Sequence, residues 1–591
     1  MEAIPDPIPV SEPYFDLGPC HFPITTTSSS AQQWFDRGLA LCYSFNHEEA
    51  VRCFYQCLAH DLECPMAYWG IAYSLGANYN KTWEIFEPGE VECVLPKIKA
   101  ALDRVSELEV KGDKLETALI GSLRARMPDD LKRRDYEQWN RAYIAAMREV
   151  YETFPDNLDV TALYAEAMMV LTPWKLWDVH TGLPAPGSLA VEIETVLESA
   201  MKRFPSQADQ HPGILHFYIH LTEMSSSPEK ALPAANALQD LLPDAGHIQH
   251  MPSHIYFLAG DYQRAIRSNQ LAVQADEKYV NLRGPGGFYL VYRMHSMEFI
   301  VYSAMFAGQY QVAMRYAEMI ERNLPLGVDL GTSAGYFIEA TYAIRVQVYV
   351  RFGRWDEIKS LPLPSDPSVY PITTAFTHWG KAIAYSATRD VPAAEASQKL
   401  YLAAFQNIPA TALMFPNTAR DVLSVGTAFL QGELEYRKGN YDTAFSSLEE
   451  SIRLYDNLVY SEPWSWLTPV RHAYAALKLE QGCVSEALSV YYADLGFNDT
   501  LARAHQHPGN IWALRGAYEC LLRLGKEREG EARIVWPLLR TAMAMADVEV
   551  EVSCFCRIGE RGDEGEDLVR QGESIGRVED GVGKEKTGCC A

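Results

Sequence analysis

Hydrophobic positions return at helical spacing along most of the chain. From Gln32 onward, apolar side chains recur every three or four residues, as they do on one face of an α-helix. Trp34, Leu39 and Tyr43 form one such run, and Phe54 belongs to the next. Breaks that contain proline or glycine separate the runs, and the strict alternation of a β-strand is rare. The pattern predicts an all-α protein.

A short turn motif recurs between the predicted helices. It reads glycine, any residue, an aromatic residue, two further residues and alanine. The motif occurs at 260–265, 308–313 and 439–444; 482–487 keeps the glycine and the alanine, and 353–355 is a partial copy. This turn is typical of tetratricopeptide repeats, in which each helix pair buries one face on its neighbour. We therefore expect an α-solenoid of stacked antiparallel helix pairs, curled around a central cavity.

Changes in composition divide the chain into four parts. Residues 1–30 are rich in proline, threonine and serine and are expected to form an extended lead-in. Residues 31–360 are predicted to be an N-terminal helical array, and residues 361–548 a C-terminal one that begins at a proline-rich break. Residues 549–591 are rich in glycine and glutamate and have few aromatic side chains, so we expect a disordered tail there.

Charge and the chain ends exclude several classes of partner. The net charge of −25 argues against a nucleic-acid backbone or an anionic membrane as partner. No apolar run approaches the length of a membrane span, and the first residues lack the pattern of a signal peptide. The 12 cysteines follow no regular framework. These features predict a cytoplasmic protein with reduced thiols.

The stretch 211–254 carries the most distinctive chemistry. It contains six of the 15 histidines of the chain. Pro212 suits the first turn of a helix, and downstream of it His216, His220 and Glu223 fall on one helical face. Pro252 suits a second helix start, which would bring His250 and His254 to its beginning. Imidazoles and a carboxylate from two neighbouring helices are what a transition-metal site needs.

The sequence therefore predicts a centre for a divalent transition metal (Cu, Fe or Zn). Its core ligands would be His216, His220 and His254, with His250 or Glu223 completing the set. Glu223 or Asp276 would otherwise hold a ligand ring through a hydrogen bond. The weaker candidate ligands are His211, His247, His47 and His295.

The competing interpretation is a buried network of histidines that hydrogen-bond to acids and to the backbone. The number and register of the histidines leave the two interpretations evenly balanced. Other common sites are absent from the sequence. It has no His-Glu-x-x-His, no C-x-x-C pair, and no glycine–lysine pair followed by the serine or threonine of a phosphate loop.

Several blocks in order resemble a family of long tetratricopeptide-repeat proteins of bacteria and fungi, mostly of unassigned function. The blocks are FNHEEA at 45–50, HPG at 211–213, HFYIH at 216–220, GH at 246–247 and HMPSH at 250–254. The resemblance implies the repeat fold and says little about activity. His295 departs from the family pattern, because it is followed by serine where relatives have asparagine, so it is a less secure site position.

Two functions follow from these observations. The first is a scaffold whose concave surface binds a protein partner or a small molecule, as an accessory protein of a biosynthetic pathway. The second is a metal-dependent enzyme that uses the histidine centre to activate water or O₂. The resemblance alone suggests fungal specialised metabolism as its setting. Retention of a stoichiometric metal ion would distinguish the enzyme from the scaffold.

Overall fold

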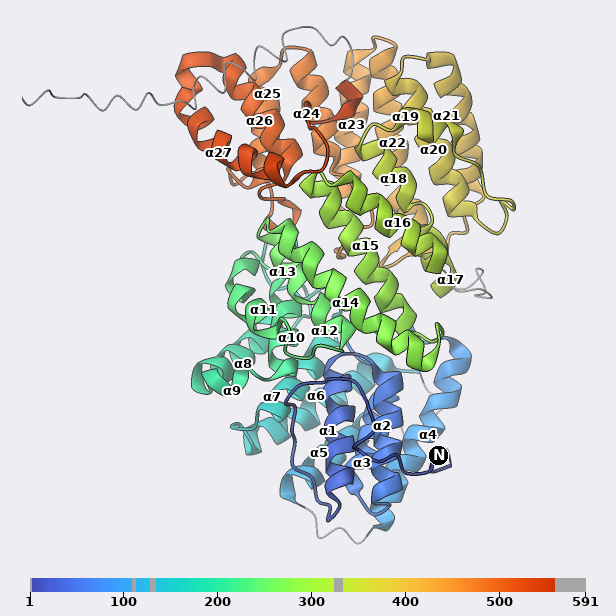
Figure 1. The fold of residues 1–591 in the computed structure, drawn as a ribbon, viewed down its shortest axis with the longest axis vertical. Helices are drawn as coiled ribbons and strands as arrows, with labels where there is room; N and C mark the ends of the chain where they lie inside the picture. Colours follow the sequence, from blue (N-terminus) through green and yellow to red (C-terminus); the bar gives the residue numbers. More distant parts are fainter. Residues whose placement is uncertain (1–2, 109–112, 128–133, 324–332, 558–591) are drawn as a thin grey trace, which may run out of the picture.

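The computed structural model describes residues 3–108, 113–127, 134–323 and 333–557 (Figure 1). Within these ranges almost all regular structure is helical. The only strands there, β1 (Leu413–Met414) and β2 (Asn417–Thr418), form a small antiparallel pair.

The helices follow one another along the chain with short connections. The first third contains α1 (Ser29–Tyr43), α2 (His47–His60), α3 (Pro65–Ser74), α4 (Pro88–Glu107), α5 (Lys114–Ala125), α6 (Tyr136–Thr153), α7 (Leu158–Met169), α8 (Ala190–Arg203) and α9 (Pro205–Ala208). The middle contains α10 (Pro212–Thr222), η1 (Pro228–Ala231), α11 (Leu232–Leu238), α12 (Gly246–His250), α13 (Pro252–Leu258), α14 (Tyr262–Arg283), α15 (Tyr289–Ala307), α16 (Tyr310–Asn323), α17 (Ser333–Thr341), α18 (Ile344–Arg351) and α19 (Trp355–Ser360). The last third contains α20 (Pro371–Ala387), α21 (Val391–Gln406), α22 (Ala419–Arg437), α23 (Tyr441–Asp456), α24 (Val470–Glu480), α25 (Val484–Leu495), η2 (Arg503–His505), α26 (Ile511–Leu524), η3 (Gly525–Arg528), α27 (Glu529–Met545) and η4 (Phe555–Arg557).

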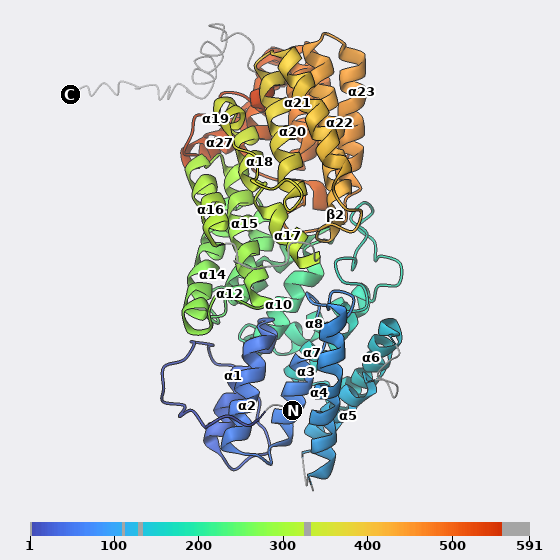
Figure 2. The same ribbon diagram turned by 90° about the vertical axis from the view of Figure 1, so that its right-hand side faces the viewer.

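Neighbouring helices form a continuous stack. Most long helices pack on the next one along the chain, as α1 does on α2 and α22 on α23. Several also contact the second helix onward, such as α1 with α3, α20 with α22 and α24 with α26. This is the packing of a solenoid, and the predicted all-α solenoid is confirmed (Figures 1 and 2).

The repeated turn motif has the expected backbone. Its glycines have φ between 63° and 84°, the left-handed region that closes a helix. The residue after each glycine donates its N–H to the carbonyl five residues earlier, as Asp261 does to Tyr256 at 2.8 Å. The motif alanines Ala265, Ala313 and Ala444 are fully buried where two helices meet. A larger side chain there would push the helices apart.

The two ends of the chain pack onto the array. Residues 3–28 have no helix and are held on α1 and α2; Trp34, for example, donates to the carbonyl of Ile8 at 3.1 Å. The predicted tail begins at 549, but Arg557 pairs with Glu519 at 2.7 and 2.8 Å, so residues 549–557 lie against α26. Residues 558–591 of that tail lie outside the described residues.

The C-terminal array also returns to the middle of the chain. Tyr262 at the start of α14 donates to the carbonyl of Pro508 at 2.8 Å, and Trp512 donates to the carbonyl of Met305 at 2.7 Å. Arg503 pairs with Glu229 at 2.6 Å. These contacts dock the segment before α26 onto α13–α15, at the level where the two halves meet in Figure 2. The curl of the solenoid therefore brings segments from both halves to one place.

None of the described helices is at once long and apolar enough to cross a bilayer. Cys554 and Cys556 form a disulfide, which differs from the expectation of reduced thiols throughout. The other described cysteines are free.

Gly260 and Gly439 offer a matched test of the docking between the halves. Both have left-handed backbones, but a Cβ at Gly260 would lie 2.5 Å from the Pro508 carbonyl, whereas one at Gly439 would meet nothing within 4 Å. Gly439→Ala should cost about 1–2 kcal/mol. Gly260→Ala should cost more, because it also pushes the docked segment away. Thermal unfolding of both variants measures the difference, and equal unfolding temperatures would contradict the docking.

Candidate metal centre

Six histidines gather where four helices of the middle region meet. His216 and His220 lie on α10, His247 and His250 on α12, His254 on α13 and His295 on α15. Pro212 starts α10 as predicted, and Pro252 divides α12 from α13 within two residues. The resulting chain direction turns His250 and His254 toward α15. All six rings are buried or nearly so.

Three of these rings converge on one point. The Nε2 of His250 lies 2.6 Å from the Nε2 of His254 and 3.1 Å from the Nε2 of His295. Two nitrogens bound to one tetrahedral zinc ion lie about 3.3 Å apart, given Zn–N bonds of about 2.0–2.1 Å. We call His250, His254 and His295 the inner triad. The separation of 3.1 Å is close to this value and that of 2.6 Å is shorter, while all three rings offer a nitrogen within 4.8 Å of the others.

The opposite ring nitrogens of the inner triad are held by acceptors. Asn269 donates its amide N–H to the carbonyl of Ala265 at 2.9 Å, so its Oδ1 faces His250 and accepts from Nδ1 at 2.6 Å. The Nδ1 of His254 bonds to Oε2 of Glu223. A neutral imidazole that donates through Nδ1 has only a lone pair at Nε2. Where Glu223 is ionised and accepts from His254, the lone pairs of His250 and His254 therefore face each other.

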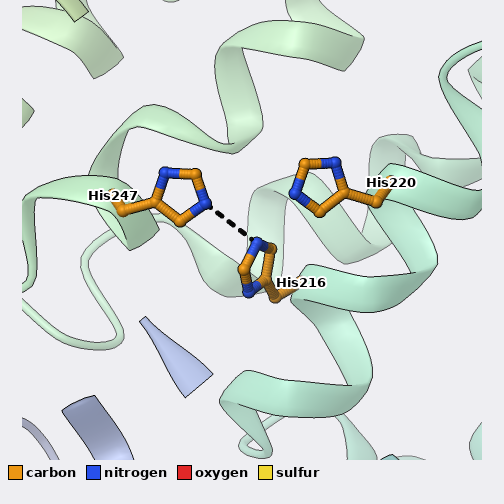
Figure 3. Close-up of side chains that lie close together, drawn as sticks. All are labelled: His216, His220 and His247. Atoms are coloured by element: carbon orange, nitrogen blue, oxygen red, sulfur yellow. Dashed lines mark hydrogen bonds between the residues drawn. The ribbon is translucent and has the colours of Figure 1, made fainter. Parts of the chain in front are cut away.

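A second group, the outer triad, comprises His216, His220 and His247 (Figure 3). One nitrogen of each ring lies within 4.8 Å of the others. The Nε2 atoms of His216 and His247 are 3.1 Å apart, and the Nδ1 of His216 donates to the carbonyl of Tyr43 at 2.7 Å. The Nδ1 of His220 bonds to Oε1 of Glu223 at 2.9 Å, and its Nε2 has no hydrogen-bond partner within the described residues.

Glu223 thus connects the two triads. Its Oε1 holds His220 of the outer triad and its Oε2 holds His254 of the inner triad, and its side chain is fully buried. An ionised carboxylate that accepts from both rings fixes both tautomers, with the Nε2 lone pairs directed away from Glu223. Glu223 also forms a third possible ligand group with His254 and Glu462, with ligand atoms within 4.8 Å of one another, so it can orient a ligand ring or bind an ion itself.

Burial favours the uncharged forms of these groups. It lowers the pKa of His216 to about 3 and that of His295 to about 4. Burial, and then the other histidines, lower the pKa of His254 well below its usual value. Burial, and then the charge of Glu462, raise the pKa of Glu223 well above its usual value. Neutral imidazoles are the form that binds a metal, and a cation would favour the ionised carboxylate.

Glu462 and His507 were not among the predicted site residues. Both line a cavity of about 20 Å³ together with His254, and burial raises the pKa of Glu462 to about 8. The Nδ1 of His507 bonds to Asp494 at 2.8 Å, while its Nε2 has no partner in the described part of the chain. Both residues lie more than 200 positions after His254 in the sequence, and neither belongs to a recognisable local motif. Sequence reasoning therefore could not predict that they lie beside His254.

The predicted ligands are thus divided rather than gathered at one point. The sequence grouped His216 and His220 with His254, but His216 and His220 join His247, and His254 joins His250 and His295. Helical register correctly put His216 and His220 on one face. It does not determine which helix crosses that face, and α12 supplies the third ring. His247 and His295, predicted as weaker candidates, are full members of the triads.

His47, His211 and Asp276 lie outside both triads. His47 bonds through Nδ1 to the carbonyl of Ser74 at 3.0 Å. His211 caps α10 by accepting from the N–H of Ile214 at 3.2 Å. Asp276, a predicted partner for a ligand ring, is buried against Gly246, where a Cβ would lie 1.9 Å from its Oδ1. Among the described residues, His220 and His254 bond to Glu223, and no histidine bonds to Asp276.

No protein-family model and no curated protein matches the chain. Several solved structures of low sequence identity match the chain. Yeast Tom70 shares 12% identity over 92% of this chain and 95% of that chain, with a TM-score of 0.32. The APC/C hetero-tetramer Cut9–Hcn1 shares 13% over 82% and 77%, with a TM-score of 0.29. The human IFIT1 dimer with PPP-AAAA shares 13% over 86% and 89%, also with a TM-score of 0.29. Likeness at this level supports no inference about function, and the resemblance to a bacterial and fungal family stays a prediction.

Because His211 caps α10 and lies outside both triads, its substitution should change the stability of the protein but not its metal content. His211→Ala should lower stability by about 1 kcal/mol, because the N–H of Ile214 loses its acceptor. His211→Asn should retain most of that stability, since asparagine is a good cap. Thermal unfolding and metal analysis of both variants provide the measurement. A loss of bound metal in His211→Asn would instead make His211 part of the centre.

Proposed function

We propose that this protein is a metal-dependent enzyme in which the inner triad binds a divalent transition-metal ion. The observation that carries the proposal is the convergence of three Nε2 atoms, of which that of His250 is an acceptor because Asn269 accepts from its Nδ1, and that of His254 is one when Glu223 is ionised. Two lone pairs at 2.6 Å repel each other unless a cation or a proton lies between them. Three histidines with a free fourth position are a common ligand set of catalytic zinc, and imidazole also suits copper and iron.

The cavity beside His254 supports a catalytic ion over a purely structural one. A structural site is closed, whereas a catalytic site keeps a position for water or substrate. The volume of about 20 Å³ holds one water molecule, since about 10–15 Å³ is enough. A bound ion would lower the pKa of such a water to about 7. His507, held by Asp494 and free at Nε2, is suited to accept the proton of that water.

The competing interpretation is a metal-free network. In that case a protonated Glu223 would donate to His254, and the Nε2–H of His254 would donate to His250. This arrangement satisfies the same contacts with a proton in place of the ion. This network corresponds to the interpretation of packed core histidines. The metal site and the metal-free network predict different amounts of metal in the purified protein and different effects of Glu223→Gln.

Elemental analysis of the purified, untagged protein tests the proposal. We expect close to stoichiometric zinc, copper or iron in the parent, and its loss from the inner triad in His250→Ala/His295→Ala. His21→Ala serves as control, because that side chain is 58% exposed. Circular dichroism confirms that each variant is folded. A folded parent protein that binds none of these ions, even after incubation with each and desalting, would refute the proposal.

The variant Glu223→Gln distinguishes a metal ion at the inner triad from a proton in the metal-free network. A glutamine cannot accept from both His220 and His254, so the affinity for the ion should fall by about 10- to 100-fold. Glutamine imitates a protonated glutamate, so in the metal-free network this change should leave stability nearly unaltered. Glu166→Gln is the matched control, since Glu166 is buried on Tyr73 away from the centre. Competition with a chelator measures the affinities.

The scaffold function stays as a second candidate because the array offers a binding surface. A hollow of about 590 Å³ lies on α21, α22 and α23. Its walls combine apolar Leu402 and Phe405 with polar Gln431 and Ser447. A hollow of this composition would suit a protein segment or a small molecule. Binding there would not need the histidines, so variants of the inner triad should leave it intact.

A further inference from the structure

We propose that the outer triad binds a second metal ion, so that the protein contains a two-ion centre. This inference rests on the proposed function, because the two sites share Glu223. The outer triad supplies three imidazoles from two helices, His216 and His220 from α10 and His247 from α12 (Figure 3). The ligand class is a transition-metal cation that accepts nitrogen donors.

The hydrogen bonds of the outer triad prepare its nitrogens for a cation. A carbonyl oxygen can only accept, so the bond from His216 to Tyr43 O puts the proton on Nδ1 and a lone pair on Nε2. The bond from His220 Nδ1 to Glu223 likewise leaves the Nε2 of His220 without a hydrogen-bond partner among the described residues. The 3.1 Å between the Nε2 atoms of His216 and His247 is close to the separation of two ligands on one ion.

Hydrogen bonds alone leave this group incomplete. Two ring nitrogens are buried without a hydrogen-bond partner in the described ranges: Nδ1 of His247 and Nε2 of His220. They stay without a partner even if His247 donates to His216. A buried polar group without a partner costs about 1–3 kcal/mol. An ion that binds the Nε2 of all three rings would satisfy His220, whose nitrogen is otherwise directed at the other two rings (Figure 3).

The surroundings give the second ion a different environment from the first. The ring of Phe45 lies 4.6 Å from that of His216 and 5.3 Å from that of His247, and it stacks on His220 at 6.1 Å. Phe45 is 3% exposed and has a left-handed φ of 52°, which is costly for a residue other than glycine. This apolar cover closes the outer triad, whereas one member of the inner triad, His254, lines a cavity.

The closed site gives the second ion a structural role rather than a substrate-binding one. Rings of the two triads come within 5.9 Å of each other, as between His220 and His254. Glu223 bonds to one ring of each triad, so the two sites share a buried carboxylate.

Titration of the chelator-treated full chain with Zn²⁺ tests this inference. Calorimetry and elemental analysis should give two ions per chain for the parent and for His21→Ala. They should give one ion for His216→Ala/His247→Ala and one for His250→Ala/His295→Ala. His220→Gln is a second outer-site variant that disturbs packing less, and it should also bind one ion tightly.

Each outcome separates this inference from the proposed function. One ion in the parent, kept in His216→Ala/His247→Ala and lost in His250→Ala/His295→Ala, would overturn the second ion and leave the proposed function intact. One ion in the parent that is lost in His216→Ala/His247→Ala and kept in His250→Ala/His295→Ala would overturn both the second ion and the proposed function. The ion would then lie in the closed outer site alone. If His220→Gln binds two ions as tightly as the parent does, His220 is not a ligand, and the proposed outer site is contradicted. No ion in the parent would overturn both.

Discussion

The arrangement of the centre depends on one buried carboxylate. Glu223 bonds to His220 on one side and to His254 on the other, and its side chain is fully buried. In a low-dielectric interior such an acid is costly unless it is neutral or paired. The two imidazoles provide hydrogen-bond partners for both of its oxygens, and the same two bonds orient the rings. The position of Glu223 after the last turn of α10 therefore sets the geometry of both triads.

The solenoid supplies the short helices that this geometry needs. Most units of the stack are long helix pairs, but α12 and α13 are brief and are divided by Pro252. A proline cannot continue the hydrogen-bond ladder of the preceding helix, so the chain changes direction there. This change turns His247 toward α10 and His250 and His254 toward α15. Regular repeats on both sides hold the interruption in position.

Long-range closure completes the site. The C-terminal array brings Glu462 and His507 onto α13 and α15, while the N-terminal helices bring Phe45 over the outer triad. Contacts such as Trp512 to Met305 and Tyr262 to Pro508 fix this curl. One side of the centre is thus closed by an apolar ring, and the other side retains space for a small ligand. The chemical difference between the two triads arises from this asymmetry.

The sequence by itself determined the local parts of this structure. Helical periodicity and the glycine–alanine turns specified the all-α stack, since both depend on neighbours three to five residues away. The same register put His216, His220 and Glu223 on one face of α10. Only the tertiary structure decided that His247 joins His216 and His220, that His295 joins His250 and His254, and that Glu462 and His507 line the adjoining cavity. Those groupings depend on helix crossings and on the curl of the array, which no local spacing encodes.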